Sequence, residues 1–235
     1  YIHETLSAQL DANLKEVGVS GYTIENVSQV QDKEGKWRPI DSDKDPTVIL
    51  LHYPSILEDT INYIPPRVKI EISCLSMDEP TELRQIRSLI GESFDGEDTD
   101  ADSLARTVVP TRTFLEKLFL LAEEFQKEKP RSVRMSRHLY DLAKLMDTEY
   151  GVEALSNRTL YDAIVEHRKA YYALKYVNYD LHAPSTINFT IPESVIGAWQ
   201  DDYTDMKRFF IYGESLEFEA LMQKMKELQE RVKIL

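Results

Sequence analysis

Two charged side chains lie within apolar, helix-patterned segments of this chain, where a charge needs a partner. Lys117 adjoins a stripe that recurs at three- and four-residue steps, formed by Phe114, Leu115, Leu118, Leu121, Ala122 and Phe125. Asp141 lies within a second stripe, formed by Leu139, Leu142, Ala143 and Met146. Because a carboxylate beside an apolar face is costly without an opposite charge, the pattern predicts an ion pair between Lys117 and Asp141. Such a pair either links two packed helices or belongs to a catalytic site.

The stretch that joins these segments is basic, although the whole chain carries a net charge of −13. Between positions 127 and 144 there are six basic and two acidic residues, which gives this window a net charge of +4 (six minus two). The overall charge argues against a protein that coats nucleic acid through its general field. A local basic patch suits a phosphate-bearing ligand bound at one place, and a solvated linker is the other interpretation.

Glu71 is a third residue that could take part in chemistry. It lies in segment 68–73, where apolar and polar residues alternate. In a strand, the side chains of Glu71 and Lys69 would project from one face and that of Ile70 from the other. Taken alone, this is the pattern of an ordinary amphipathic strand. Glu71 becomes a candidate only in combination with Lys117 and Asp141.

Composition limits the class of protein. The chain has 235 residues, of which 42% are hydrophobic and 29% charged, so it can bury one large or two small cores. No span approaches the ~20 apolar residues of a membrane helix, which predicts a soluble protein. The single cysteine, Cys74, excludes an internal disulfide and a cysteine-based zinc site. Together with the lack of a signal-peptide pattern, this predicts a cytoplasmic location, and any metal must be held by oxygen or histidine ligands.

The elements that must position these residues change in type along the chain. A helix is expected over 1–17, followed by strands at 22–27, 37–40, 48–53 and 68–73. Residues 84–94 fit strand or helix, and 95–102 form an acidic loop. Helices are expected at about 112–128, 136–148, 157–175, 194–210 and 215–234. We therefore predict an α+β fold, with a small mixed sheet and flanking helices in 1–105 and a C-terminal helical bundle in 106–235.

These segments resemble a known family, the AbiEii/AbiGii toxins of the DNA-polymerase-beta-like nucleotidyltransferase superfamily. The resemblance covers roughly residues 65–220 and rests on segments 68–72, 109–117, 134–142, 199–206 and 210–213. It implies a nucleotidyltransferase fold in which two divalent metal ions, held by carboxylates, bind the triphosphate of an NTP and activate an attacking hydroxyl. Such chemistry requires positive charge for the triphosphate and oxygen ligands for Mg²⁺.

The resemblance also implies a role for each candidate residue. Glu71 matches the third metal-associated carboxylate, Lys117 the lysine that contacts the triphosphate, and Asp141 the acid paired with that lysine. Arg134, Arg137 and His138 would line the phosphate side of the same site.

The chain departs from the family in one motif. The superfamily carries a Gly-Ser dipeptide followed by an Asp-x-Asp strand, and no Gly-Ser occurs in the 235 residues. The spacing Asp-x-Asp occurs at 41–43 and 98–100, but both stretches are polar and turn-rich, so we interpret them as loop acids. Because the chain opens at Tyr1 directly in a helical pattern, we expect the motif upstream. The isolated chain should then be inactive.

Two functions follow from the resemblance. The first is metal-dependent transfer of a nucleotide from an NTP to an acceptor, by family analogy an RNA such as tRNA. The protein would then be the toxin of a toxin–antitoxin or phage-defence system with a protein antitoxin. The alternative is a truncated or degenerate relative that acts as a non-catalytic interaction protein.

Two further patterns leave alternatives open. Four tyrosines occur at helical spacing: Tyr171, Tyr172, Tyr176 and Tyr179. They either stack against nucleic-acid bases or pack with their hydroxyl groups at the surface. An apolar seam from Phe218 to Leu235 fits a terminal helix docked on its own domain, or a helix that pairs with a partner or a second copy.

Overall fold

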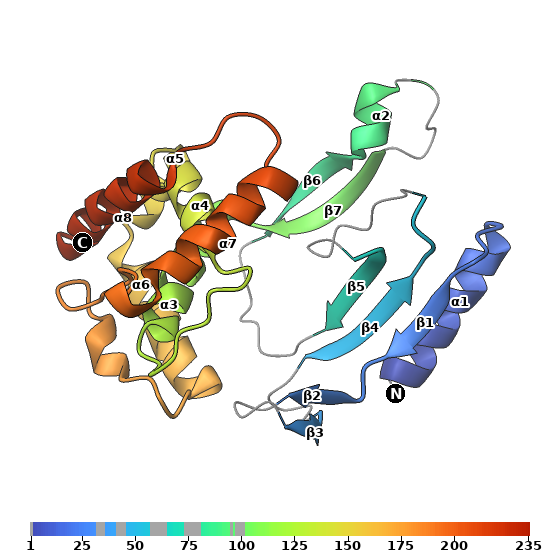
Figure 1. Cartoon of the computed structure of the whole chain (residues 1–235), viewed down its shortest axis with the longest axis horizontal. Helices are drawn as coiled ribbons and strands as arrows, with labels where there is room; N and C mark the ends of the chain where they lie inside the picture. The colour runs from blue at the N-terminus through green and yellow to red at the C-terminus, as the bar shows by residue number, and fades with distance from the viewer. Residues whose placement is uncertain are drawn as a thin grey trace. The chain divides into compact units, whose positions relative to one another are not determined.

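The computed structural model of the chain describes residues 2–31, 36–40, 46–56, 65–72, 81–94, 96 and 102–235. The chain divides into two compact units, Tyr1–Ser76 and Met77–Leu235, which are described separately here (Figure 1). Cys74 and the acidic pairs at 41–43 and 98–100 lie outside the described residues.

The first unit contains a three-stranded antiparallel sheet in the order β1-β4-β5. Its strands are β1 (Thr23–Asn26), β4 (Thr47–His52) and β5 (Arg67–Ile72). β4 is central because it is the most apolar strand, and its residues Val48, Ile49 and Leu50 are buried. The five-residue π-helical turn η1 (Ile2–Leu6) and α1 (Ser7–Glu16) precede the sheet, and β2 (Gln29–Gln31) pairs with β3 (Trp37–Pro39). The predicted N-terminal helix and the four predicted strands are confirmed.

The second unit begins with an antiparallel pair of strands, β6 (Thr81–Arg87) and β7 (Asp102–Val108). Between them lies the short helix α2 (Leu89–Ser93), whose start is capped by the Ser88 hydroxyl, which accepts a hydrogen bond from the Gly91 amide at 2.9 Å. The ambiguous segment 84–94 is therefore strand first and helix after Ser88. The sequence analysis did not predict β7.

The rest of the second unit is helical. Its α-helices are α3 (Pro110–Glu124), α4 (Ser136–Leu145), α5 (Glu149–Ala154), α6 (Arg158–His167), α7 (Ile196–Phe209) and α8 (Phe218–Lys233). Shorter turns are η2 (Arg168–Tyr172), η3 (Tyr179–His182) and η4 (Glu193–Val195). α3 packs against α4, α5 and α6, and α4 also packs against α7 and α8. α3 forms the centre of this core, because its side chains Phe114, Leu115, Leu118, Phe119 and Leu121 are fully buried.

The predicted α+β class is confirmed. The predicted sheet was mixed, whereas the strand pairs in the described part of the chain are all antiparallel. The change from strands to helices falls between β7 and α3, close to the predicted boundary at residue 105, while the compact units divide after Ser76. The position of a domain boundary at 105 stays a prediction. The C-terminal seam docks on its own unit, since Phe218, Leu221 and Val232 of α8 are buried there.

No helix in the described ranges is both long enough and apolar enough to cross a lipid bilayer.

Candidate active site

The predicted ion pair between α3 and α4 is confirmed. The Lys117 Nζ lies 2.7 Å from the Asp141 Oδ2, and the two side chains are 23% and 35% exposed. Their neighbours in the apolar stripes, Leu118 and Leu142, are fully buried, so the pair lies at the rim of a well-packed helix contact. A partly exposed pair of this kind adds little to stability, and it remains accessible to a ligand.

Glu71 belongs to β5 of the first unit, in a different compact unit from Lys117 and Asp141. Its carboxylate forms an ion pair with Lys69 at 2.7 Å, and both side chains are about half exposed. Convergence of Glu71 with the Lys117–Asp141 pair stays a prediction.

His138 lies one helical turn before Asp141 and is buried. Burial, reinforced by the positive charges of Lys117 and Arg137, lowers the pKa of His138 from 6.5 to about 4. Its Nδ1 is buried without a hydrogen-bond partner among the described residues. At neutral pH this side chain is therefore an uncharged imidazole, so the predicted contact of His138 with phosphate would be made as a neutral donor rather than as a cation.

The lowered pKa of His138 predicts that stability falls on mild acidification. Between pH 6.5 and about 4 the unfolded chain binds a proton at His138 that the folded protein does not, so the free energy of unfolding decreases as pH falls through this window. At about 1.4 kcal/mol for each pKa unit, the loss over the whole window is at most about 3.5 kcal/mol. Urea denaturation at pH 7 and pH 5 measures it.

The substitution His138→Gln should reduce this pH dependence. Burial also lowers the pKa of His167 and of His182, so part of the dependence should persist in the variant. An unchanged difference between pH 7 and pH 5 in His138→Gln would contradict the assignment.

The start of α4 is held by a carboxylate from a distant helix. Asp202 of α7 is buried and accepts hydrogen bonds from the Arg134 amide at 2.5 Å, the Ser136 amide at 2.9 Å and the Ser136 hydroxyl at 2.5 Å. Arg134 has a positive φ of 59°, which is uncommon for a residue other than glycine. The three hydrogen bonds stabilise this turn. Asp202 therefore fixes the turn that carries Arg134 and the start of the helix that carries Arg137, and both arginines are exposed.

Sequence reasoning included Asp202 only as part of the segment 199–206 and missed this role. A signal was present, because Asp202 shares one helix face with the apolar residues Trp199, Tyr203 and Met206. A carboxylate on a buried face requires donors.

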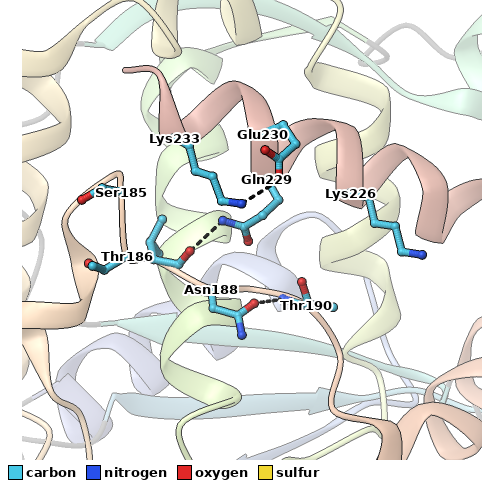
Figure 2. Close-up of a pocket in the computed structure, with 9 residues that line it drawn as sticks. Ser185, Thr186, Asn188, Thr190, Lys226, Gln229, Glu230 and Lys233 are labelled. Atoms are coloured by element: carbon cyan, nitrogen blue, oxygen red, sulfur yellow. Dashed lines mark hydrogen bonds and ion pairs between the residues drawn. The ribbon is translucent and has the colours of Figure 1, made fainter.

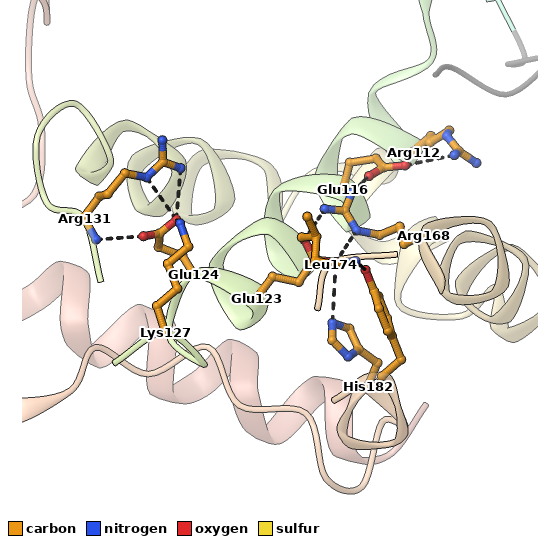
Figure 3. A network of polar contacts seen from close by, with 10 residues as sticks. Arg112, Glu116, Glu123, Glu124, Lys127, Arg131, Arg168, Leu174 and His182 are labelled. Atoms are coloured by element: carbon orange, nitrogen blue, oxygen red, sulfur yellow. Dashed lines mark hydrogen bonds and ion pairs between the residues drawn. The ribbon is translucent and has the colours of Figure 1, made fainter. Parts of the chain in front are cut away.

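Part of the basic window is neutralised within the second unit. The buried Glu124 accepts hydrogen bonds from Lys127 at 2.6 Å and from the Arg131 guanidinium at 2.9 Å (Figure 3). Burial alone would raise the pKa of Glu124, but the hydrogen bonds from Arg131 and Lys127 outweigh it and lower this pKa. Arg134 and Arg137 are exposed on and just after the turn that precedes α4, and their role as a phosphate-facing rim stays a prediction.

A buried ion network runs along α3 beside Lys117 (Figure 3). Arg168 of η2 forms a two-point contact with Glu123, with nitrogen–oxygen distances of 2.7 and 2.5 Å, and also pairs with Glu116. Glu116 in turn accepts a hydrogen bond from Arg112 at 2.9 Å. Burial opposes the charge of Arg168, but the hydrogen bonds and charge of Glu123 raise the pKa of Arg168 overall.

This network was not predicted, although its members are charged residues next to apolar stripes. Glu116 and Glu123 are seven residues apart and therefore lie on the same side of α3. Their partner, Arg168, is 45 residues beyond Glu123, and a single sequence does not specify a pairing over that distance.

A groove of about 500 Å³ lies between α8 and the segment 185–190 (Figure 2). Gln229 bridges to this segment, donating to the Ile187 carbonyl at 2.6 Å and accepting from the Phe189 amide at 3.3 Å. Lys233 on its rim is paired with Glu230 at 2.6 Å. None of its lining residues belongs to the predicted site, so the chemistry of the Lys117–Asp141 pair, rather than the size of this groove, locates the candidate site.

The described residues do not by themselves form a metal site. Within 2–31, 36–40, 46–56, 65–72, 81–94, 96 and 102–235, no three histidine, cysteine, aspartate or glutamate side chains come together in a group able to hold a metal ion. Glu71 alone does not provide the ligand set that Mg²⁺ needs.

The second unit therefore places a partly exposed lysine–carboxylate pair at the rim of its helical core, within an α+β fold. A family model described as the nucleotidyl transferase AbiEii toxin of type IV toxin–antitoxin systems matches residues 1–224. Because this match covers nearly the whole chain, the protein belongs to the AbiEii nucleotidyltransferase toxin family. The match begins before residue 65, where the resemblance in the sequence analysis began. A search of curated proteins finds no match to the chain.

Proposed function

We propose that the protein transfers a nucleotidyl group from an NTP to an RNA acceptor, as the toxin of a toxin–antitoxin or phage-defence pair. The observation that carries this proposal is the Lys117–Asp141 pair, a preorganised cation at a partly exposed rim. In the reaction an acceptor hydroxyl oxygen bonds to the α-phosphorus of the NTP, the bond from that phosphorus to the bridging oxygen breaks, and pyrophosphate leaves. Such a reaction depends on positioned positive charge more than on covalent help.

Lys117 is proposed to contact the triphosphate. Its ammonium group has three donors, so it can keep its hydrogen bond to Asp141 while it donates to phosphate oxygens. Asp141 is then a positioning residue, since it holds the ammonium in place before the nucleotide binds. Arg134, on the turn whose shape Asp202 maintains, and Arg137, in the first turn of α4, would add charge.

The proposed cofactor is Mg²⁺, with Glu71 as one of its oxygen ligands. Further oxygen ligands would be needed, because a single carboxylate places the ion too loosely for an in-line displacement. We also propose that the protein acts in the cytoplasm, where NTPs and RNA are present, and that a protein antitoxin restrains it.

A second candidate function is that of a non-catalytic interaction protein. The observation in its favour is that the 235 residues contain no Gly-Ser dipeptide, a part of the nucleotidyltransferase motif. On this hypothesis the helical unit binds a partner, and the Lys117–Asp141 pair only links α3 to α4.

The test is a labelling experiment with the gene product and, in parallel, with its Lys117→Ala variant. Each is incubated with Mg²⁺, total RNA and one of the four NTPs labelled at the α-phosphate. We expect label in RNA and release of pyrophosphate with the wild type, and at least about a hundredfold less of both with the variant. If the wild type labels no RNA with any NTP, the interaction-protein hypothesis is favoured.

A further inference from the structure

The π-helical turn η2 displays an exposed tyrosine on a fixed base. Tyr171 is 66% exposed, and its ring is stacked on that of the buried His167, with centroids 4.7 Å apart and an interplanar angle of 29°. Burial lowers the pKa of His167, so this supporting ring is uncharged at neutral pH. A ring supported by one neighbour and otherwise exposed is suited to stack against another flat group.

The backbone of this turn is unusual and firmly anchored. η2 is π-helical, a form that occurs often at functional sites, and it ends at Ala173 with a positive φ of 43°. Arg168, the first residue of the turn, is locked to Glu123 and Glu116 of α3. The Tyr171 platform is therefore preorganised, so little conformational entropy is lost when a ligand binds to it.

The exposed charges of the platform's own segment are positive. Segment 167–176 contains three basic residues and no acidic one, although the chain has a net charge of −13; of the three, Arg168 is buried and paired with Glu123 and Glu116. Lys169 and Lys175 are exposed on this segment. Lys127, which is paired with Glu124, lies over the ring of Tyr176, 5.3 Å from its centroid.

From this combination we infer that the Tyr171 platform binds single-stranded RNA, with an unstacked base on the Tyr171 ring and phosphates near Lys169 and Lys175. Aromatic rings beside a cationic surface are the recurring means of binding single strands, whereas the bases of a duplex are already stacked. The inference deepens the proposed function, on which it rests. It gives the acceptor RNA a docking surface on the same unit as Lys117. Arg168, at the start of η2, pairs with Glu116, and Glu116 directly precedes Lys117 in the sequence.

The experiment measures the binding of a fluorescein-labelled, 12-nucleotide single-stranded RNA by anisotropy, without NTP. Since stacking of one base on an aromatic ring contributes about 1–3 kcal/mol, Tyr171→Ala should weaken binding by about five- to 150-fold. Tyr171→Trp should retain it. Tyr212→Ala is the matched control, because Tyr212 is a 91% exposed tyrosine on the same unit and should have no effect.

Two further arms separate stacking from general charge attraction. A duplex of the same sequence should bind more weakly than the single strand, and poly-glutamate should compete poorly. Lys169→Gln should make the affinity less dependent on salt. Thermal unfolding of each variant checks that the surface change leaves the fold intact.

The inference is overturned if Tyr171→Ala binds the single strand within twofold of wild type, or if the duplex or poly-glutamate binds equally well. Failure of the proposed function has a different signature. In that case Tyr171-dependent RNA binding persists, but no NTP labels the RNA.

Discussion

Replacing Lys117 by alanine is expected to lower the rate of nucleotidyl transfer at least about a hundredfold, the scale seen when one preorganised electrostatic contact is removed. Stability should change little, because the pair with Asp141 is partly exposed and contributes under about 1 kcal/mol. Asp141→Ala should lower the rate to a similar degree by releasing the Lys117 ammonium from its position. Initial rates of RNA labelling by each variant and by the wild type measure both effects.

The matched control for this prediction is Lys224→Ala. Lys224 also pairs with an aspartate of a different segment, Asp147, at 2.8 Å, and with similar exposure. Its loss should leave the rate unchanged. The double variant of Lys117 and Asp141 should be no slower than the slower single variant, because the two residues act as a unit. Full activity in either single variant would show that the pair is only a link between α3 and α4.

The second large effect is expected on stability. Glu123→Ala should reduce the free energy of unfolding by about 3–5 kcal/mol, because it leaves the buried Arg168 guanidinium without its two-point partner. The remaining contact with Glu116 does not replace two hydrogen bonds in a buried position. Equilibrium denaturation in urea at pH 7 provides the measurement.

Two variants make this prediction specific. Arg158→Ala removes an exposed pair with Asp162 at 2.8 Å within α6 and should cost less than about 1 kcal/mol. The double variant Glu123→Leu, Arg168→Met should be more stable than Glu123→Ala, since apolar side chains of similar size often replace a buried pair at low cost. If Glu123→Ala and Arg158→Ala destabilise the protein equally, the ion network does not anchor η2 to α3.

The features that the sequence predicted correctly are those set by local periodicity. The apolar stripes of α3 and α4 fix which faces are buried, and a charge beside such a face requires a partner, so the Lys117–Asp141 contact followed from the pattern. The strand β4 was similarly evident, because a short apolar run bounded by polar residues is typical of a central strand.

The features that the sequence did not predict depend on contacts between distant segments or on contradictory local signals. β7 is polar and exposed along much of its length, and only pairing with β6 makes it a strand. α5 has Gly151 in its middle, where a side chain would lie 2.3 Å from the Leu145 carbonyl, so the residue reflects close packing rather than a helix end. The expected helix over 157–175 instead becomes π-helical after His167, where Arg168 reaches Glu123.

The position of α3 at the centre of the second unit has a consequence for genetic selection. This helix carries Lys117 at its rim and Glu116 and Glu123 in the buried network, so one element supports both the proposed chemistry and the folded state. Selection for cells that survive expression of the toxin should then recover two kinds of α3 mutant. Changes at Lys117 would leave normal amounts of protein in the cell, whereas changes at Glu123 would deplete it through degradation of the unfolded chain.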